Sequence, residues 1–183
     1  EQALFYQSVV SHLAGRNVRA DLAGLDAKLQ QALSMPIDPA IIKAAANAGT
    51  IYFAGLNDGV AEELTLKTNE ITRKKSDFLE GTYAVHGIEE VMDKNDIVFV
   101  VDPIPEEMEK FKKVLVDGVG LKVVAIADRP TMFDTIVTPD AGEMSAFVQL
   151  CAGWNVLVEI GLALGINLDK PQRARKVGNE FVG

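Results

Sequence analysis

Apolar residues recur at helical spacing along the first part of the chain. Residues 3–13 predict a short apolar helix, and residues 19–33 predict one amphipathic helix with leucines three or four positions apart. Residues 38–49 predict a third helix, with Asp38 as N-cap and Pro39 at the first helical position. The chain is therefore expected to begin with helices.

The pattern changes after residue 49, where short runs rich in β-branched residues alternate with helical segments. The predicted strands are 50–55, 96–103, 122–128 and 134–139. The predicted helices are 58–72, 105–117 and 142–165. Two of the strands are continuously apolar, as expected of parallel strands covered on both faces. The alternation predicts an α/β fold, a flavodoxin-like three-layer α/β/α sandwich around a parallel sheet of four to five strands.

The same pattern divides the chain into three parts. Residues 1–36 are predicted to form N-terminal helices that pack on the domain, residues 37–166 the α/β domain, and residues 167–183 a C-terminal tail. We find no internal repeat, low-complexity tract or interdomain linker.

Composition narrows the class of protein. The 26 acidic and 18 basic residues give a formal net charge of −8, which disfavours a nucleic-acid-binding surface. No apolar run reaches the roughly 18 residues that a membrane-spanning helix needs, so no membrane partner is expected. The single cysteine, Cys151, lies in an apolar helical run and is predicted to be a buried core residue. A lone cysteine suits a reducing, cytoplasmic location.

One polar constellation stands out in the segment 58–92. Glu63, Lys67 and Glu70 fall at i, i+4 and i+7 and are predicted to share one helix face. That helix begins at the carboxyl end of a strand, the edge where ligands bind in such sheets. His86 follows Glu70 after 16 residues and precedes Gly87. A carboxylate and an imidazole can move a proton next to a carbonyl, although a solvated ladder of ion pairs is the plain alternative.

A family resemblance rests on these residues and their neighbours. The runs "YFAG", "NDGVAEELTLKTNEIT", "EGTYAVHGIEEVM" and "DIVFVVDP" resemble the second sugar isomerase (SIS) domain of glucosamine-6-phosphate synthase and related 6-phosphate deglycases. That domain carries the pattern E-x-x-x-K-x-x-E followed by a His-Gly pair. The tail "GLALGINLDKPQRARKVGNE" resembles the family's C-terminus, in which an Asp-x-Pro turn precedes a lysine, here Lys176. The resemblance runs from about residue 20 to the end.

The resemblance implies roles for four catalytic residues. Glu70 would shuttle a proton between C1 and C2 of an open-chain sugar phosphate, and Lys67 would lie beside it. His86 would help to open the sugar ring in the site of a neighbouring subunit, which implies a homodimer or a paired SIS domain. Lys176 would reach the sugar carbonyl. Burial is expected to raise the pKa of the Glu70 carboxyl group, and the positive charge of the nearby lysine to oppose this rise. No metal or organic cofactor is implied.

Further residues are predicted to contact the substrate. Gly55 ends the first predicted strand and Asn57 and Asp58 follow it, so all three lie at its ligand edge. Glu63 and Gly87 complete this predicted set.

The sequence departs from the family pattern at two places. Tyr83 and Ile88 stand where the family's histidine loop has glutamate and proline. Residues 102–107, "DPIPEE", stand where a phosphate-gripping SIS domain has a loop rich in Ser and Thr. The chain also begins at Glu1 without methionine. We therefore expect a fragment, or a chain whose phosphate loop comes from another SIS domain.

The tail offers another possible contact for the phosphate. Lys170, Arg173 and Arg175 are candidate phosphate ligands, with a solvated basic tail as the alternative.

Three functions fit the sequence to different degrees. The leading prediction is a catalytic SIS domain acting on 6-phosphosugars, by aldose/ketose isomerisation coupled to amination, deamination or deglycation. The lack of a visible glutaminase pattern tilts this prediction towards deglycation. The alternative is a non-catalytic SIS module that senses a sugar phosphate. A redox or nucleotide-binding flavodoxin-like domain is a third possibility, which the absence of a glycine-rich phosphate loop disfavours.

Overall fold

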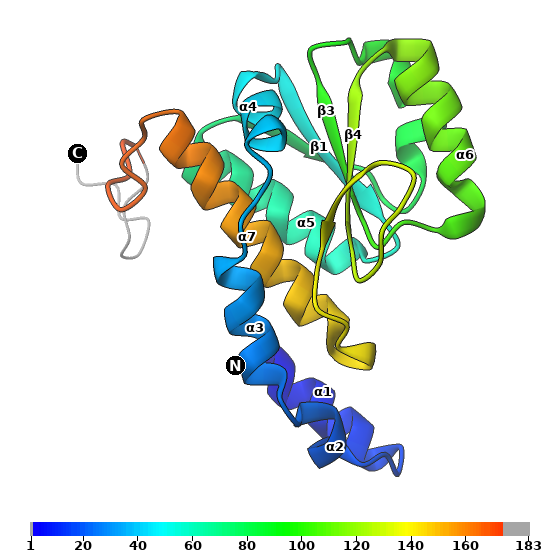
Figure 1. Cartoon of the computed structure of the whole chain (residues 1–183), viewed down its shortest axis with the longest axis vertical. Helices are drawn as coiled ribbons and strands as arrows, with labels where there is room; N and C mark the ends of the chain where they lie inside the picture. The colour runs from blue at the N-terminus through cyan, green and yellow to red at the C-terminus, as the bar shows by residue number, and fades with distance from the viewer. Residues whose placement is uncertain (1, 174–183) are drawn as a thin grey trace.

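The computed structural model describes residues 2–173 and leaves the side chains of Asp21 and Asp58 undescribed. Five strands form one parallel sheet in the order β2-β1-β3-β4-β5. They are β1 (Thr50–Gly55), β2 (Lys75–Phe78), β3 (Ile97–Val101), β4 (Lys122–Ala127) and β5 (Asp134–Val137). This is the flavodoxin order, so the predicted fold is confirmed (Figure 1).

Strand β2 is the element that the sequence pattern missed. Its four residues, "KSDF", alternate between exposed and half-buried positions and carry two charges. It pairs with β1 alone, at the edge of the sheet, where charged residues are common because one side of the strand faces solvent. A polar edge strand of this length lacks the apolar signature of the central strands.

The helices surround this sheet. They are α1 (Gln2–Leu13), α2 (Val18–Leu22), α3 (Leu25–Ser34), α4 (Pro39–Asn47), α5 (Asp58–Lys67), α6 (Met108–Phe111) and α7 (Ser145–Ala163). Two π-helical segments, η1 (Thr68–Thr72) and η5 (Lys112–Val119), continue α5 and α6. Short 3₁₀ turns are η2 (Tyr83–Val85), η3 (Ile88–Val91), η4 (Pro105–Glu107) and η6 (Gly142–Met144).

The prediction of one continuous helix over residues 19–33 is wrong, because the structure has two helices there. The chain breaks between α2 and α3 at Gly24, whose φ of 70° lies in the left-handed region. Glycine adopts this conformation at little cost, so it ends one helix and starts the next in a new direction. The predicted N-cap of α4 is confirmed, because the Asp38 side chain accepts a hydrogen bond from the Ala40 amide.

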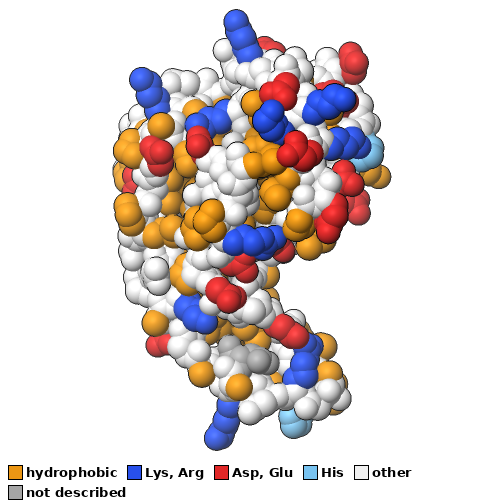
Figure 2. Space-filling view, turned by 45° about the vertical axis from the view of Figure 1, so that its right-hand side comes forward, with side chains coloured by type: hydrophobic (Ala, Val, Ile, Leu, Met, Phe, Trp, Pro, Cys, Tyr) orange, Lys and Arg blue, Asp and Glu red, His pale blue; other side chains and the backbone are white. Residues whose placement is uncertain are grey.

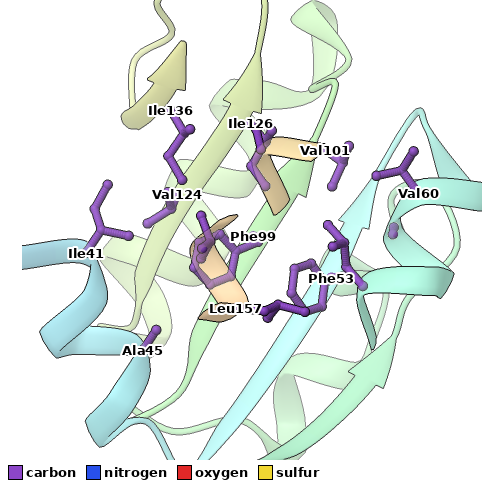
Figure 3. Close-up of a cluster of buried hydrophobic side chains, with 14 of the residues drawn as sticks. Ile41, Ala45, Phe53, Val60, Phe99, Val101, Val124, Ile126, Ile136 and Leu157 are labelled. Carbon is purple, nitrogen blue, oxygen red and sulfur yellow. The ribbon is translucent and has the colours of Figure 1, made fainter. Parts of the chain in front are cut away.

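Both faces of the sheet are covered, which explains the continuous apolar strands. On β3, Phe99 and its alternate neighbours face α4, α5 and α7, and Phe99 stacks on Phe53 with ring centroids 5.4 Å apart (Figure 3). Val98 and Val100 face the other way, towards Phe111 of α6. This double burial supplies the hydrophobic driving force for the three-layer sandwich.

Helix α7 is the central helix of the larger core. Residues 142–163 are long and apolar enough to cross a membrane by length and composition, contrary to the sequence-based expectation. Its inner face, including Val148, Val156 and Ile160, is buried in the core beside α3, α4 and α5. The core helix of a sandwich passes the same test of length and composition, so the apolar character of α7 is explained by packing.

The first two helices form an arm that projects from the body (Figure 1). Several apolar side chains of α1 are exposed, among them Phe5, Tyr6, Val10 and Leu13. Arg16 pairs with Glu143 at the base of the arm, and α3 packs along α7. Figure 2 shows the same arm, with acidic and basic side chains interspersed over the face in view.

Candidate functional site

The predicted ladder of charges forms along α5 and η1. The Lys67 Nζ lies 2.8 Å from Glu70 Oε2 and 3.9 Å from Glu63 Oε1. The three side chains therefore share one face, as their spacing predicts. The hydrogen bond to Glu70 raises the pKa of Lys67, burial opposes this, and the charges of Glu63 and Glu70 add to the rise. Lys67 therefore stays an ammonium group and orients the Glu70 carboxylate.

Two buried threonines account for the widened helix that carries Glu70. The Thr68 hydroxyl donates to the Leu64 carbonyl, and the Thr72 hydroxyl donates to the Thr68 carbonyl, each at 2.7 Å. These side chains compete with the backbone amides for the i−4 carbonyls, which favours the longer π-helical pattern. Single π-helical turns are frequent at functional sites.

Asn69 fixes this turn against the edge strand. Its Nδ2 donates to the carbonyls of Thr65 and Ser76, and its Oδ1 accepts from the Ser76 amide. The amide thus pairs with both backbone groups of a β2 residue. Asn69 was absent from the predicted site, although a polar residue between Lys67 and Glu70 was a signal for it.

Glu70 opens onto a pocket of about 430 Å³ between η1, the start of β2 and the C-terminal segment. The lining residues are Asn69, Glu70, Arg73, Lys74, Lys75, Pro171, Gln172 and Arg173. The Glu70 side chain is 52% exposed, so the predicted burial of the base is wrong. Lys176 lies outside the described residues, but Pro171–Arg173, which precede it, line the pocket with Glu70. The volume is in the range of small-molecule sites.

The pocket lies at the amino edge of the sheet. Helix α5 starts at the carboxyl end of β1 and must return across the sheet before β2 runs parallel to β1. Glu70 comes at the end of this return, next to Lys75, which pairs with the first residue of β1, Thr50. The inference that Glu70 lies at the carboxyl edge is therefore wrong, and only the start of α5 lies there.

His86 occupies a different part of the molecule. It follows η2, whose Ala84 and Val85 pack on the α6 face of the sheet. The His86 Nε2 lies 3.2 Å from Lys110 Nζ and 3.1 Å from Thr82 Oγ1. Within one chain, His86 does not line the Glu70 pocket.

Gly87 has a conformational role beside this histidine. Its φ of 110° lets the chain turn from His86 into η3, and its amide donates to Glu89 Oε2 at 2.5 Å. The exposed Tyr83 and the half-buried Ile88, which depart from the family pattern, flank this turn in η2 and η3. Direct contact of Gly87 with substrate stays a prediction.

Gly55 and Asn57, two predicted substrate contacts at the carboxyl edge, each have a role in the packing of the fold. A Cβ atom on Gly55 would lie 2.0 Å from the Val101 carbonyl oxygen, so glycine is required for the approach of β1 to β3. The Asn57 Nδ2 donates to Gln149 Oε1 of α7 at 2.8 Å. The hollow beside Gly55 measures about 10 Å³, too small for a sugar. The Asp58 side chain lies outside the described residues.

The carboxyl edge after β3 is acidic. Asp102 has a left-handed φ of 51°, and burial raises the pKa of its carboxyl group, while Arg129 lowers it and Asp128 adds to the rise. Arg129 Nη1 lies 2.8 Å from Asp128 Oδ1 and 3.7 Å from Asp102 Oδ1. One arginine shared by two carboxylates leaves this edge unsuited to phosphate. Within residues 2–173, no cluster of three metal-ligating side chains occurs.

Lys74 anchors the pocket floor. Its Nζ donates hydrogen bonds to the carbonyls of Ala46, at 3.1 Å, and Ala48. These two carbonyls belong to the C-terminal end of α4, so the lysine caps that helix. Burial lowers the pKa of Lys74. The triplet 73–75, "RKK", was not among the predicted site residues, although three consecutive cations directly after an amphipathic helix are a visible signal.

Replacing Lys74 by methionine is expected to lower the free energy of unfolding by about 1–2 kcal/mol, because two carbonyls lose their donor. The pKa of Lys74 is lower in the folded chain than its ordinary value of about 10.5, so the unfolded chain binds more protons between these two pKa values. The advantage of the wild type over Lys74→Met should therefore grow as pH rises through this window. Urea titrations of both proteins between neutral and alkaline pH measure it, and a constant difference would contradict the burial of the ammonium group.

Comparison with solved structures identifies the architecture. The C-terminal domain of glucosamine-fructose-6-phosphate aminotransferase from Francisella tularensis is similar over 84% of this chain and 45% of its own, with a TM-score of 0.62 and 19% identity. Glucosamine-6-phosphate deaminase from Thermotoga maritima is similar over 91% of this chain and 51% of its own, with a TM-score of 0.67 and 19% identity. The chain has the sugar isomerase (SIS) fold.

The SIS fold also occurs in a regulator. The sugar isomerase domain of the RpiR transcription factor from Sphaerobacter thermophilus is similar over 80% of this chain and 88% of its own, with a TM-score of 0.61 and 16% identity. No protein-family model and no curated protein matches the sequence. The chain spans about half the length of the first two structures.

Proposed function

We propose that this chain is the acid–base half of a catalytic site for sugar 6-phosphates. The observation that carries the proposal is the Glu63–Lys67–Glu70 ladder, whose last member, Glu70, lines a pocket shared with the C-terminal segment. The same ladder and tail carry the resemblance to the second SIS domain of the synthase, and the SIS fold supports it. The likeness to aminotransferase and deaminase structures supports a reaction at C1 and C2 of a phosphosugar.

In this proposal Glu70 acts as general base. The carboxylate removes a proton from C1 of the open-chain ketose, an enediol forms, and the proton returns to C2 to give the aldose. Lys67 holds the carboxylate in place and stays positively charged, since hydrogen bonding to Glu70 raises its pKa. Lys176 would polarise the sugar carbonyl. The chemistry requires no metal or organic cofactor, and a cytoplasmic location supplies phosphorylated sugars.

The preferred reaction within this class is deglycation. A ketosamine adduct offers the same C1–C2 unit to Glu70. Transfer of the proton from C1 to C2 would convert the adduct into an imine at C1, and addition of water to this imine would release the amine and leave the aldose 6-phosphate. Neither an ammonia source nor a glutaminase pattern is needed for this reaction.

His86 is proposed to serve the site of a partner subunit. In one chain it does not line the Glu70 pocket, and the resemblance implies that this histidine is presented across an interface. The exposed apolar side chains of α1 supply a surface on which a second copy could dock. A homodimer would then bring the Glu70 of one chain and the His86 of the other to each site.

Subunit complementation tests this arrangement. Homodimers of Glu70→Gln should be inactive, and homodimers of His86→Ala should open the sugar ring slowly. After unfolding and refolding together in equal amounts, about half of the dimers are mixed, and each mixed dimer has one intact site, so about a quarter of the wild-type activity should return. Activity is measured as turnover of fructose 6-phosphate.

The control for complementation mixes Glu70→Gln with Glu70→Gln/His86→Ala, which leaves no intact site in any dimer. No recovery in the first mixture, with dimers confirmed by sedimentation, would contradict a shared site. A linear substrate analogue should partly rescue His86→Ala, since it bypasses ring opening.

The second candidate function is a module that senses a sugar phosphate without turnover. The likeness to the sugar isomerase domain of the RpiR transcription factor favours it. It differs from the catalytic proposal in one measurable way, because sensing needs binding but does not need Glu70 as a base.

A further inference from the structure

The pocket beside Glu70 is basic, although the chain as a whole is acidic. Four basic side chains line it: Arg73, Lys74, Lys75 and Arg173. The only carboxylate in that lining is Glu70, which already pairs with Lys67. An adjoining hollow shares Arg73, Pro171 and Gln172 with the pocket and adds Lys170. Positive charge therefore concentrates here in a protein with a net charge of −8.

Most of these cations have no ion-pair partner among residues 2–173. None of Arg73, Lys75 and Arg173 forms an ion pair with another residue that the structure describes. Lys75 and Arg173 are exposed. The like charges of such a cluster repel one another, which raises the electrostatic free energy of the protein. Binding of an anion lowers this free energy.

Arg73 is held in an orientation that leaves part of its guanidinium available. Its Nη2 donates to the carbonyls of Lys170, at 2.9 Å, and Asn167, at 3.5 Å. Its Nη1 and Nε have no hydrogen-bond partner within residues 2–173. Its backbone adopts a left-handed φ of 57°, a strained conformation for a long side chain. These contacts join the C-terminal segment to the pocket and fix the arginine between them.

The other edge of the sheet cannot take the same ligand. The loop after β3 carries Asp102, Glu106 and Glu107, and Arg129 is committed to Asp102 and Asp128. A phosphate there would meet carboxylates and an arginine that already pairs with two of them. The described part of the chain therefore offers one strongly basic pocket at the amino edge and an acidic loop at the carboxyl edge.

We propose that the basic pocket binds the phosphate group of the sugar phosphate, with Arg73, Lys75 and Arg173 as its ligands. Arginine suits phosphate because its planar N–H groups match pairs of phosphate oxygens. The inference rests on the proposed function, since Glu70 must reach C1 and C2 while three carbons separate C2 from the phosphate-bearing C6. A phosphate subsite beside Glu70, rather than at it, meets this requirement. The phosphate is then gripped by this chain itself, without a Ser/Thr loop.

The double variant Lys75→Gln/Arg173→Gln tests the subsite. Both side chains are exposed, so folding should be unaffected. Titration calorimetry of the full chain at low salt should show fructose 6-phosphate binding at least about tenfold more weakly, because two phosphate contacts are lost. The matched control Lys43→Gln/Lys94→Gln removes two exposed charges elsewhere and should bind as the wild type does.

Two further ligands identify the group that is recognised. Inorganic phosphate should compete with fructose 6-phosphate and lose affinity in the same double variant. Unphosphorylated fructose should bind no better to the wild type than to the variant. Equal affinity of wild type and variant for fructose 6-phosphate would overturn the subsite, and so would a wild type that binds neither phosphate compound at millimolar concentration.

The same measurements separate the subsite from the proposed function. If phosphate binding depends on Lys75 and Arg173 but no turnover occurs, the subsite stands and the catalytic function fails. If turnover occurs and the affinity for fructose 6-phosphate is the same in the wild type and the double variant, the proposed function is supported and the phosphate subsite is excluded. The variant Glu70→Gln should bind phosphate at least as well as the wild type, since a nearby negative charge is removed.

Discussion

Replacing Glu70 by glutamine is expected to lower the rate of proton exchange at C1 and C2 of fructose 6-phosphate by about 10³-fold, within the range typical of a lost general base. The amide has the same shape but cannot accept the proton. Substrate binding should survive, because the proposed phosphate ligands are untouched. Incorporation of solvent deuterium into the sugar, followed by NMR, measures the exchange directly and does not depend on the later fate of the enediol.

Glu62→Gln provides the matched control for this prediction. Glu62 is an exposed carboxylate of the same helix, α5, and it forms no ion pair with another residue that the structure describes. Both carboxylates are exposed, so neither substitution should change the free energy of unfolding by more than about 1 kcal/mol. A Glu70→Gln protein that binds fructose 6-phosphate and exchanges deuterium at the wild-type rate would exclude Glu70 as the base. If neither the wild type nor the variant catalyses exchange, the sensing function is favoured.

Replacing Gly55 by alanine is expected to destabilise the fold by about 4 kcal/mol or more, at the upper end of single substitutions. The new Cβ would lie 2.0 Å from the Val101 carbonyl oxygen and 2.7 Å from the Val101 amide nitrogen, and neither backbone atom can move without separating β1 from β3. The φ of 120° adds strain for any residue with a Cβ. Urea unfolding followed by circular dichroism measures the loss.

Gly59→Ala is the control for this substitution. Gly59 lies in α5, and a Cβ there would meet no atom within 4 Å. Alanine should therefore stabilise the helix by about 0.5–1 kcal/mol. If Gly55→Ala unfolds within 1 kcal/mol of the wild type, β1 and β3 do not approach each other as closely as described.

The central elements of the fold were predictable because their signals are local. The continuous apolar runs at 96–103 and 122–128 mark doubly covered strands, and the Asp38-Pro39 pair marks a helix start. Strand β2 was not predictable in this way, since its four residues are polar and it is stabilised by pairing with β1 and by the Asn69 side chain. The break at Gly24 was also missed, because a glycine inside a periodic pattern is compatible with a continuous helix until tertiary packing selects the turn.

The sequence by itself determined the alternation of the central strands with helices, and the spacing of Glu63, Lys67 and Glu70 along one helix face. It did so because hydrophobic periodicity and helical geometry depend on residues a few positions apart. Only the tertiary structure decided that Glu70 lies at the amino edge, that His86 lies elsewhere in the chain, and that the triplet 73–75 meets Arg173 in one basic pocket. The basic pocket joins segments nearly a hundred residues apart, and its position follows from the return of α5 across the sheet and the path of the chain after α7.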